Sequence, residues 1–154
     1  MKIEILLIGK TTEAWLKEGI GLYIDRLKNY IPVNITVLPA SASKLPNKMI
    51  VEESESITSK FQPRDFIILL DEHGKNLRSV ELARQIEKWM IQGVNRVVLI
   101  IGGAYGVTDD IKQKAHLQLA VSKLTFTHQM VRLILVEQLY RAMTIIRNES
   151  YHHE

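Results

Sequence analysis

Two six-residue segments, DFIILL at 65–70 and RVVLII at 96–101, constrain the fold more than any other part of the chain. Both are apolar almost throughout, instead of alternating apolar and polar residues. Continuous apolar runs of this length are typical of strands buried on both faces of a parallel sheet. Helices must then cover both faces. We therefore predict an α/β fold with a parallel sheet.

The remaining sequence alternates between strand and helix patterns. Further strands are predicted at residues 1–8, 34–38 and 118–121. Helices are predicted at residues 13–29, 48–60, 79–92, 108–116 and 128–147. Three predicted loops follow strands, namely DEHGKN (71–76), GGAYG (102–106) and SKLTFT (122–127). Parallel sheets bind ligands beyond the carboxyl ends of their strands, so these loops are the expected site.

Size and composition indicate one domain, spanning residues 1–154. The formal net charge of +3 permits binding to a polyanion such as RNA but does not identify one. The absence of cysteine excludes disulfides and thiolate chemistry and fits a reducing compartment. The apolar run at residues 3–8 is too short for a signal peptide or membrane span, so we expect a cytoplasmic protein without membrane contact.

The last predicted helix carries apolar residues around its whole circumference, including Leu133, Leu135, Val136 and Leu139. A helix of this kind must be covered on all sides. In a domain of this size, one side would face the core and another a second subunit. We therefore predict a homodimer.

The loops hold several candidate functional groups. GGAYG lets the backbone approach a ligand closely, but its spacing fits neither a dinucleotide fingerprint nor a nucleoside triphosphatase loop. Asp71, Glu72 and His73 could serve as metal ligands or as acid and base, although a solvated loop is the commoner outcome, and no metal is predicted.

Two groups flank the final helix. His128 and Arg132 share a face near its start, where free N–H groups favour an anion. After the helix come Tyr151 and His152, which either form a frayed tail or are held in a site by helix packing. Further along the helix, Glu137 is interpreted as a structural ion-pair partner of Arg141.

Several segments together resemble the ribosomal RNA large subunit methyltransferase H family. They are KIEILLIGK, LLDEHGK, LIIGGAYGV and SKLTFTHQMVRLILVEQLYRAMTIIRNESYH, which span nearly the whole chain. The resemblance implies a SPOUT-type fold with a C-terminal trefoil knot, whereas general rules of chain connection would give an open sheet. It also implies a homodimer that transfers a methyl group from S-adenosyl-L-methionine to N3 of a pseudouridine in large-subunit ribosomal RNA, within a ribosomal particle.

The resemblance also implies roles for individual residues. Tyr151 and His152 are the implied catalytic residues: His152 would be the general base or proton shuttle, and Tyr151 would stack on or hydrogen-bond to the flipped base. We expect His128, Arg132 and His153 to contact RNA, although His128 and Arg132 could instead contact the carboxylate of the cofactor. The implied cofactor contacts are Leu70, Gly102, Gly103, Val121, Ser122, Lys123, Leu124, Thr125 and Phe126.

Two positions depart from the family pattern. His153 stands where relatives carry a fixed basic residue, and Thr127 stands where they usually carry proline. The altered tail keeps open a second interpretation, a non-catalytic RNA-binding or ribosome-associated factor of the same fold, which would bind no cofactor. The residues without the resemblance also allow a flavodoxin-like or receiver-like domain, with Asp71 as the phosphate acceptor.

Overall fold

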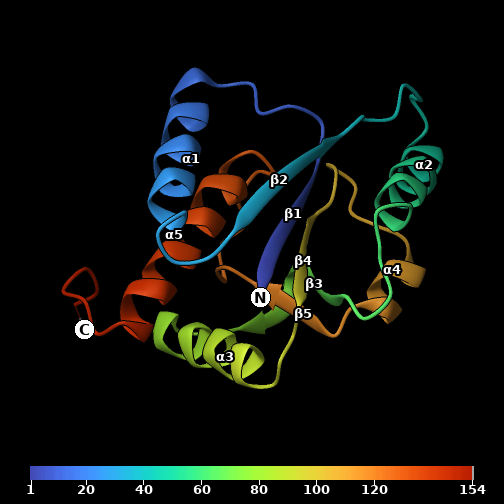
Figure 1. Cartoon of the computed structure of the whole chain (residues 1–154). Coiled ribbons are helices and arrows are strands. Elements are labelled where there is room, and N and C mark those ends of the chain that lie inside the picture. The colour runs from blue at the N-terminus through green and yellow to red at the C-terminus, as the bar shows by residue number, and fades with distance from the viewer. Residues whose placement is uncertain (154) are drawn as a thin grey trace.

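A computed structural model describes residues 1–153 of the chain. Five strands form one parallel sheet in the order β2-β1-β4-β3-β5, with helices on both faces (Figure 1). The elements are β1 Lys2–Ile8, α1 Ala14–Leu27, β2 Val33–Leu38, α2 Pro46–Thr58, β3 Phe66–Asn76, α3 Ser79–Ile91, β4 Arg96–Ile101, α4 Asp109–Lys114, β5 Leu117–Ala120 and α5 Met130–Ile146. The predicted α/β class and parallel sheet are confirmed.

The two apolar segments are the central strands. Every residue of β4 is buried, and β4 lies between β1 and β3. Helices α1, α3 and α5 cover one face of the sheet, and α2 and α4 cover the other (Figure 1). Both faces are thus shielded from water, as continuous apolar strands require.

Strand β3 is longer than predicted, so the interpretation of 71–76 as a loop is wrong. Leu119 of β5 is the partner of both Leu70 and Lys75, with a shift of register between them. Gly74 lies where this irregular part of β3 approaches β5, and a Cβ there would come within 2.6 Å of the Gln118 backbone. This pairing could not be predicted from the polar side chains of residues 71–76, because it is determined by the neighbouring strand β5.

The last helix begins at Met130, two residues later than predicted. The hydroxyl of Thr127 accepts a hydrogen bond from the Met130 amide at 3.2 Å, and so satisfies one free donor of the first turn. His128 therefore precedes the helix instead of opening it.

Each residue of α5 is at least partly buried, because α1 and α3 pack along it. Trp15 and Leu22, one heptad apart on the outer side of α1, are 55% and 49% exposed. The predicted homodimer stays a prediction, as does the knot. Among residues 1–153, no helix combines the length and apolar content needed to cross a membrane.

Candidate functional site

Three strand ends meet at the carboxyl edge of the sheet. Leu70 of β3 pairs with Ile101 on one side and with Leu119 on the other. Gly102 follows Ile101 directly, and Val121 follows Ala120 at the end of β5. The expected cofactor residues from three separate segments therefore lie side by side.

The glycine loop forms a tight turn at this edge. The amide of Gly106 donates to the carbonyl of Gly103 at 3.1 Å, and Gly106 has a φ of +84°, which favours glycine. A Cβ on Gly102 would lie 3.0 Å from Cγ1 of Val107, and one on Gly103 would overlap a carboxylate oxygen of Glu53. The glycines are thus needed for close packing and for a turn.

The segment after β5 is open on its outer side. Lys123, Leu124 and Thr125 are exposed, and the Leu124 side chain is 73% exposed. The hydroxyl of Thr125 donates to Glu72 at 3.2 Å, which ties this segment to the irregular part of β3. An adenosine needs an apolar slot and a few backbone hydrogen bonds, which Leu70, Leu124 and the adjoining main chain can supply.

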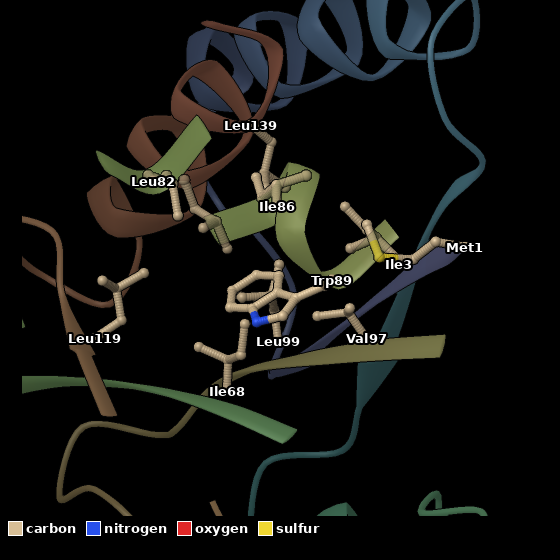
Figure 2. Close-up of a pocket in the computed structure, with 11 residues that line it drawn as sticks. Met1, Ile3, Ile68, Leu82, Ile86, Trp89, Val97, Leu99, Leu119 and Leu139 are labelled. Carbon is tan, nitrogen blue, oxygen red and sulfur yellow. The ribbon is translucent and has the colours of Figure 1, made fainter. Parts of the chain in front are cut away.

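The cavity drawn in Figure 2 lies elsewhere, in the core between the sheet and α3. Its volume is about 10 Å³, and apolar side chains such as Ile68, Ile86 and Trp89 surround it (Figure 2). A space of that size holds no more than one water molecule, and apolar cavities stay dry. It is a packing gap and not a cofactor site.

The C-terminal tail is docked against its own chain. The hydroxyl of Tyr151 donates to Glu137 at 3.0 Å and lies 3.2 Å from the hydroxyl of Tyr23 on α1. Its ring packs edge-on against Tyr140, with the Arg141 guanidinium over it at 4.8 Å. Residues 151 and 152 are thus held by helix packing and are not a frayed tail.

This docking determines the protonation of Tyr151. Burial raises the pKa of Tyr151 well above its ordinary value, and the hydrogen bonds with Tyr23 and Glu137 raise it further. The phenol therefore keeps its proton at neutral pH. It can donate a hydrogen bond or stack on a base, but it is unsuited to act as a general base.

His152 is positioned by Arg141. Nη1 of Arg141 lies 3.3 Å from Nδ1 of His152, and the guanidinium itself is bound to Glu137, as the predicted ion pair requires. Because arginine only donates, Nδ1 must accept, and the proton of the neutral ring then sits on Nε2. Nε2 is buried and has no hydrogen-bond partner among residues 1–153. In this arrangement Nε2 is a free donor, whereas the predicted role as base needs an unprotonated ring nitrogen.

Arg132 is only 2% exposed. Its guanidinium donates to the carbonyls of Ile8 at 2.7 Å and Gly9 at 3.0 Å, and to the Thr11 hydroxyl at 3.0 Å. These bonds join the start of α5 to the carboxyl end of β1. A residue so enclosed does not fit the expected contact with RNA, but it does fit a positioning role.

The other two expected RNA contacts lie at opposite ends of α5. His128 is half-buried; burial lowers its pKa, and the charge of Arg132 lowers it further, while Glu53 partly offsets both effects. His128 is thus neutral at pH 7. His153 is exposed beside the docked tail.

One chain does not bring the tail and the cofactor loops together. Helix α5 has 17 residues, so it is roughly 25 Å long. The C-terminal end lies at the opposite end of α5 from the loop that leads into this helix (Figure 1). Tyr151 and His152 therefore lie far from Phe126 and the glycine turn of the same chain.

A family model described as predicted SPOUT methyltransferase matches residues 1–152. The chain belongs to the SPOUT methyltransferase family. A solved structure described as a probable methylase family protein from Haemophilus influenzae has a TM-score of 0.55 and 12% identity, covering 99% of this chain and 70% of that chain. At that identity the likeness concerns the fold alone. The enzyme is thus a methyltransferase of SPOUT type.

Relatives of this SPOUT methyltransferase extend over its whole length. A protein of Bacteroides fragilis named ribosomal RNA large subunit methyltransferase H is 44% identical, with both chains fully covered. Proteins of the same name from Phocaeicola vulgatus and Natranaerobius thermophilus are 45% and 42% identical. Both of these proteins are covered over their full length. The matches span 100% and 99% of this chain, respectively.

Sequence reasoning missed one buried carboxylate at this edge, Glu53 of α2. Its segment carried so few apolar residues that the helix there was only weakly indicated. The available signal was its place in the row Met49, Glu53 and Ile57, spaced four apart. Burying a carboxylate at a core position of a helix costs free energy unless the carboxylate is paired or hydrogen-bonded.

Proposed function

We propose that this SPOUT enzyme transfers a methyl group from S-adenosyl-L-methionine to N3 of a pseudouridine in large-subunit ribosomal RNA. The observation that carries the proposal is the meeting of Leu70, Gly102 and the segment 121–126 at one edge of the sheet. The names of the full-length relatives support ribosomal RNA as the substrate.

The donor would be held mainly by the main chain. Leu70 and Leu124 offer apolar contacts to adenine, while backbone groups at 102–103 and 121–126 offer hydrogen bonds. When bound, S-adenosyl-L-methionine supplies an electrophilic methyl group. The protein then has to bring the target nitrogen in line with that group, and positioning alone supplies much of the acceleration.

The docked tail would bind and orient the target base. A uracil-type N3–H is weakly acidic, so its proton would leave to a water molecule as the methyl group is transferred, and a hydrogen bond to a neighbouring carbonyl oxygen would stabilise the anion. The Nε2–H of His152 is buried and has no partner within residues 1–153, so it would donate this bond once the tail moves to admit the base. Tyr151, which keeps its proton, would stack on or hydrogen-bond to the flipped base.

The complete site would form between two copies in a homodimer. The length of α5 keeps one chain's tail away from its own cofactor loops, so the tail would serve the partner's loops. The net charge of +3 on one chain would attract RNA only weakly, and a homodimer would carry twice that charge. The target would be structured RNA within a ribosomal particle, because one compact fold leaves little room for a separate RNA-binding part.

Mass spectrometry of large-subunit ribosomal RNA from a strain lacking this protein tests the proposal. The expected result is the loss of one methyl group from a single pseudouridine, restored by the wild-type chain and not by His152→Ala. A full complement of methylated pseudouridine in the deletion strain would refute the assigned substrate.

Calorimetry tests the competing interpretation, a non-catalytic RNA-binding factor. The purified protein is expected to bind S-adenosyl-L-methionine, whereas a pure binding factor would show no heat of binding. Purified ribosomal subunits are expected to be far better substrates than a short RNA hairpin. Equal turnover on both would contradict recognition within a particle.

A further inference from the structure

Glu53 is a buried carboxylate without a cationic partner. Its residue is 5% exposed, and Oε1 accepts a hydrogen bond from the Ser41 amide at 3.1 Å. Among residues 1–153, that is the one hydrogen bond recorded for this carboxylate, and no lysine or arginine pairs with it. Removing a charged carboxylate from water without such a partner is costly, so its retention needs a reason.

The second oxygen of Glu53 faces the glycine turn. Oε2 lies so close to Gly103 that an added Cβ would overlap it. The next residue on α2, Ser54, accepts a hydrogen bond from the Thr108 amide at 3.0 Å, at the far end of the same loop. Helix α2 therefore packs against the glycine loop, and the carboxylate of Glu53 faces Gly103.

No nearby group neutralises this charge. His128 interacts electrostatically with Glu53, and the pKa of His128 is lowered by burial and by Arg132, so its ring is uncharged at pH 7. The guanidinium of Arg132 is occupied by carbonyl and hydroxyl oxygens at the end of β1. Among residues 1–153, the carboxylate beside Gly103 thus has no ion-pair partner.

We propose that Glu53 recognises the positive charge of the methyl donor. This inference rests on the proposed function, since the donor has two cationic groups, the sulfonium and the α-ammonium. A carboxylate at a partly enclosed site attracts either of them more strongly than it would in water. The sulfur is neutral once its methyl group has left, so a sulfonium contact would also favour exchange of the product for fresh donor.

Isothermal titration calorimetry on the purified full-length chain tests this inference with three ligands. S-adenosyl-L-methionine carries both cations, S-adenosylhomocysteine keeps only the ammonium, and 5′-methylthioadenosine carries neither. The informative variant is Glu53→Gln, whose amide oxygen still accepts from Ser41. The matched control is Glu52→Gln, the exposed neighbour on the same helix, which contacts the Ser41 hydroxyl.

For Glu53→Gln we expect affinity for S-adenosyl-L-methionine to fall about 10- to 100-fold, and affinity for 5′-methylthioadenosine to stay within about twofold of wild type. Unchanged affinity for S-adenosylhomocysteine would identify the sulfonium as the contact, and an equal loss would identify the ammonium. Glu52→Gln should bind all three ligands as wild type does.

Two results would overturn the inference. One is wild-type affinity of Glu53→Gln for S-adenosyl-L-methionine. The other is an equal loss for all three ligands, which would mean that Glu53 only supports the glycine loop. Melting temperatures of the variants show whether the fold is retained. Failure of the wild-type chain to bind any of the three would instead count against the proposed function itself.

Discussion

At the scale of single residues, two arginines of α5, Arg132 and Arg141, use their guanidinium groups for contacts within the chain. Arg132 uses its guanidinium to hold the end of β1 against the start of α5. Arg141 orients His152 through Nδ1 and is itself held by Glu137. Both guanidinium groups thus position other groups.

Replacing Arg132 by methionine should cost about 2–4 kcal/mol of unfolding free energy, because the carbonyls of Ile8 and Gly9 lose their buried donor. Urea denaturation monitored by circular dichroism measures the change. Arg84→Met, at an exposed position of α3, is the control and should stay within about 0.5 kcal/mol of wild type. Similar losses for the two variants would show that the buried bonds contribute nothing specific.

The lowered pKa of His128 predicts a pH dependence of stability. The unfolded chain binds a proton at this ring near pH 6.5, whereas the folded chain resists it, so stability is complete above pH 6.5 and falls as the pH drops below that value. Melting temperatures measured from pH 7.5 to 5 should therefore fall less for His128→Gln than for wild type. Identical curves for His128→Gln and wild type would contradict the assignment.

At the scale of elements, the helices and strands that depend on local sequence pattern could be predicted. The strands at 65–70 and 96–101 follow from their unbroken apolar runs, and α3 (Ser79–Ile91) occupies the predicted range 79–92, although Arg78 and not Ser79 is its N-cap. The extension of β3 to Asn76 could not be predicted, because polar residues there are held by pairing with β5. The proposed role of Glu53 also depends on its contact with Gly103 of the glycine loop, which is distant in sequence and is not revealed by any local pattern.

The packing of α2 against the glycine turn makes a double-mutant prediction. Gly103→Ala should lower the free energy of unfolding by about 1–3 kcal/mol, because the new Cβ overlaps Oε2 of Glu53. Adding Glu53→Ala should recover part of that loss by making room. Chemical denaturation of the two single variants and the double variant measures this coupling.

Gly21→Ala is the control for this cycle. An added Cβ there meets nothing within 4 Å on helix α1, so alanine should stabilise the chain by up to about 1 kcal/mol. Strict additivity of the Gly103 and Glu53 substitutions would rule out the proposed contact.

At the scale of the whole molecule, the candidate site is split by α5. Sequence reasoning named the residues at both ends of this helix, from Phe126 to His152, but could not tell how far apart they lie in one chain. Strand order was equally hidden, because the neighbours of β4 come from distant parts of the sequence. Both depend on how the elements pack, which local patterns do not specify.

Mixing two inactive variants tests whether the site is shared between copies. His152→Ala removes the tail group, and Gly102→Val fills the glycine turn. After co-refolding equal amounts, half of the dimers are mixed, and each has one intact pair of loop and partner tail. Methyl transfer to ribosomal subunits should then recover to about a quarter of wild type. No recovery, despite mixed dimers verified by mass spectrometry, would mean that each chain uses its own tail.

The separation of the two halves of the candidate site by helix α5 has a kinetic consequence. If two copies share the site as proposed, a lone copy would bind its donor and yet be inactive, because its own His152 lies at the far end of the 17-residue helix α5. Turnover per chain should therefore decline on dilution below the self-association constant, while donor occupancy stays flat. Protein abundance in the cell would then regulate the rate without any dedicated effector.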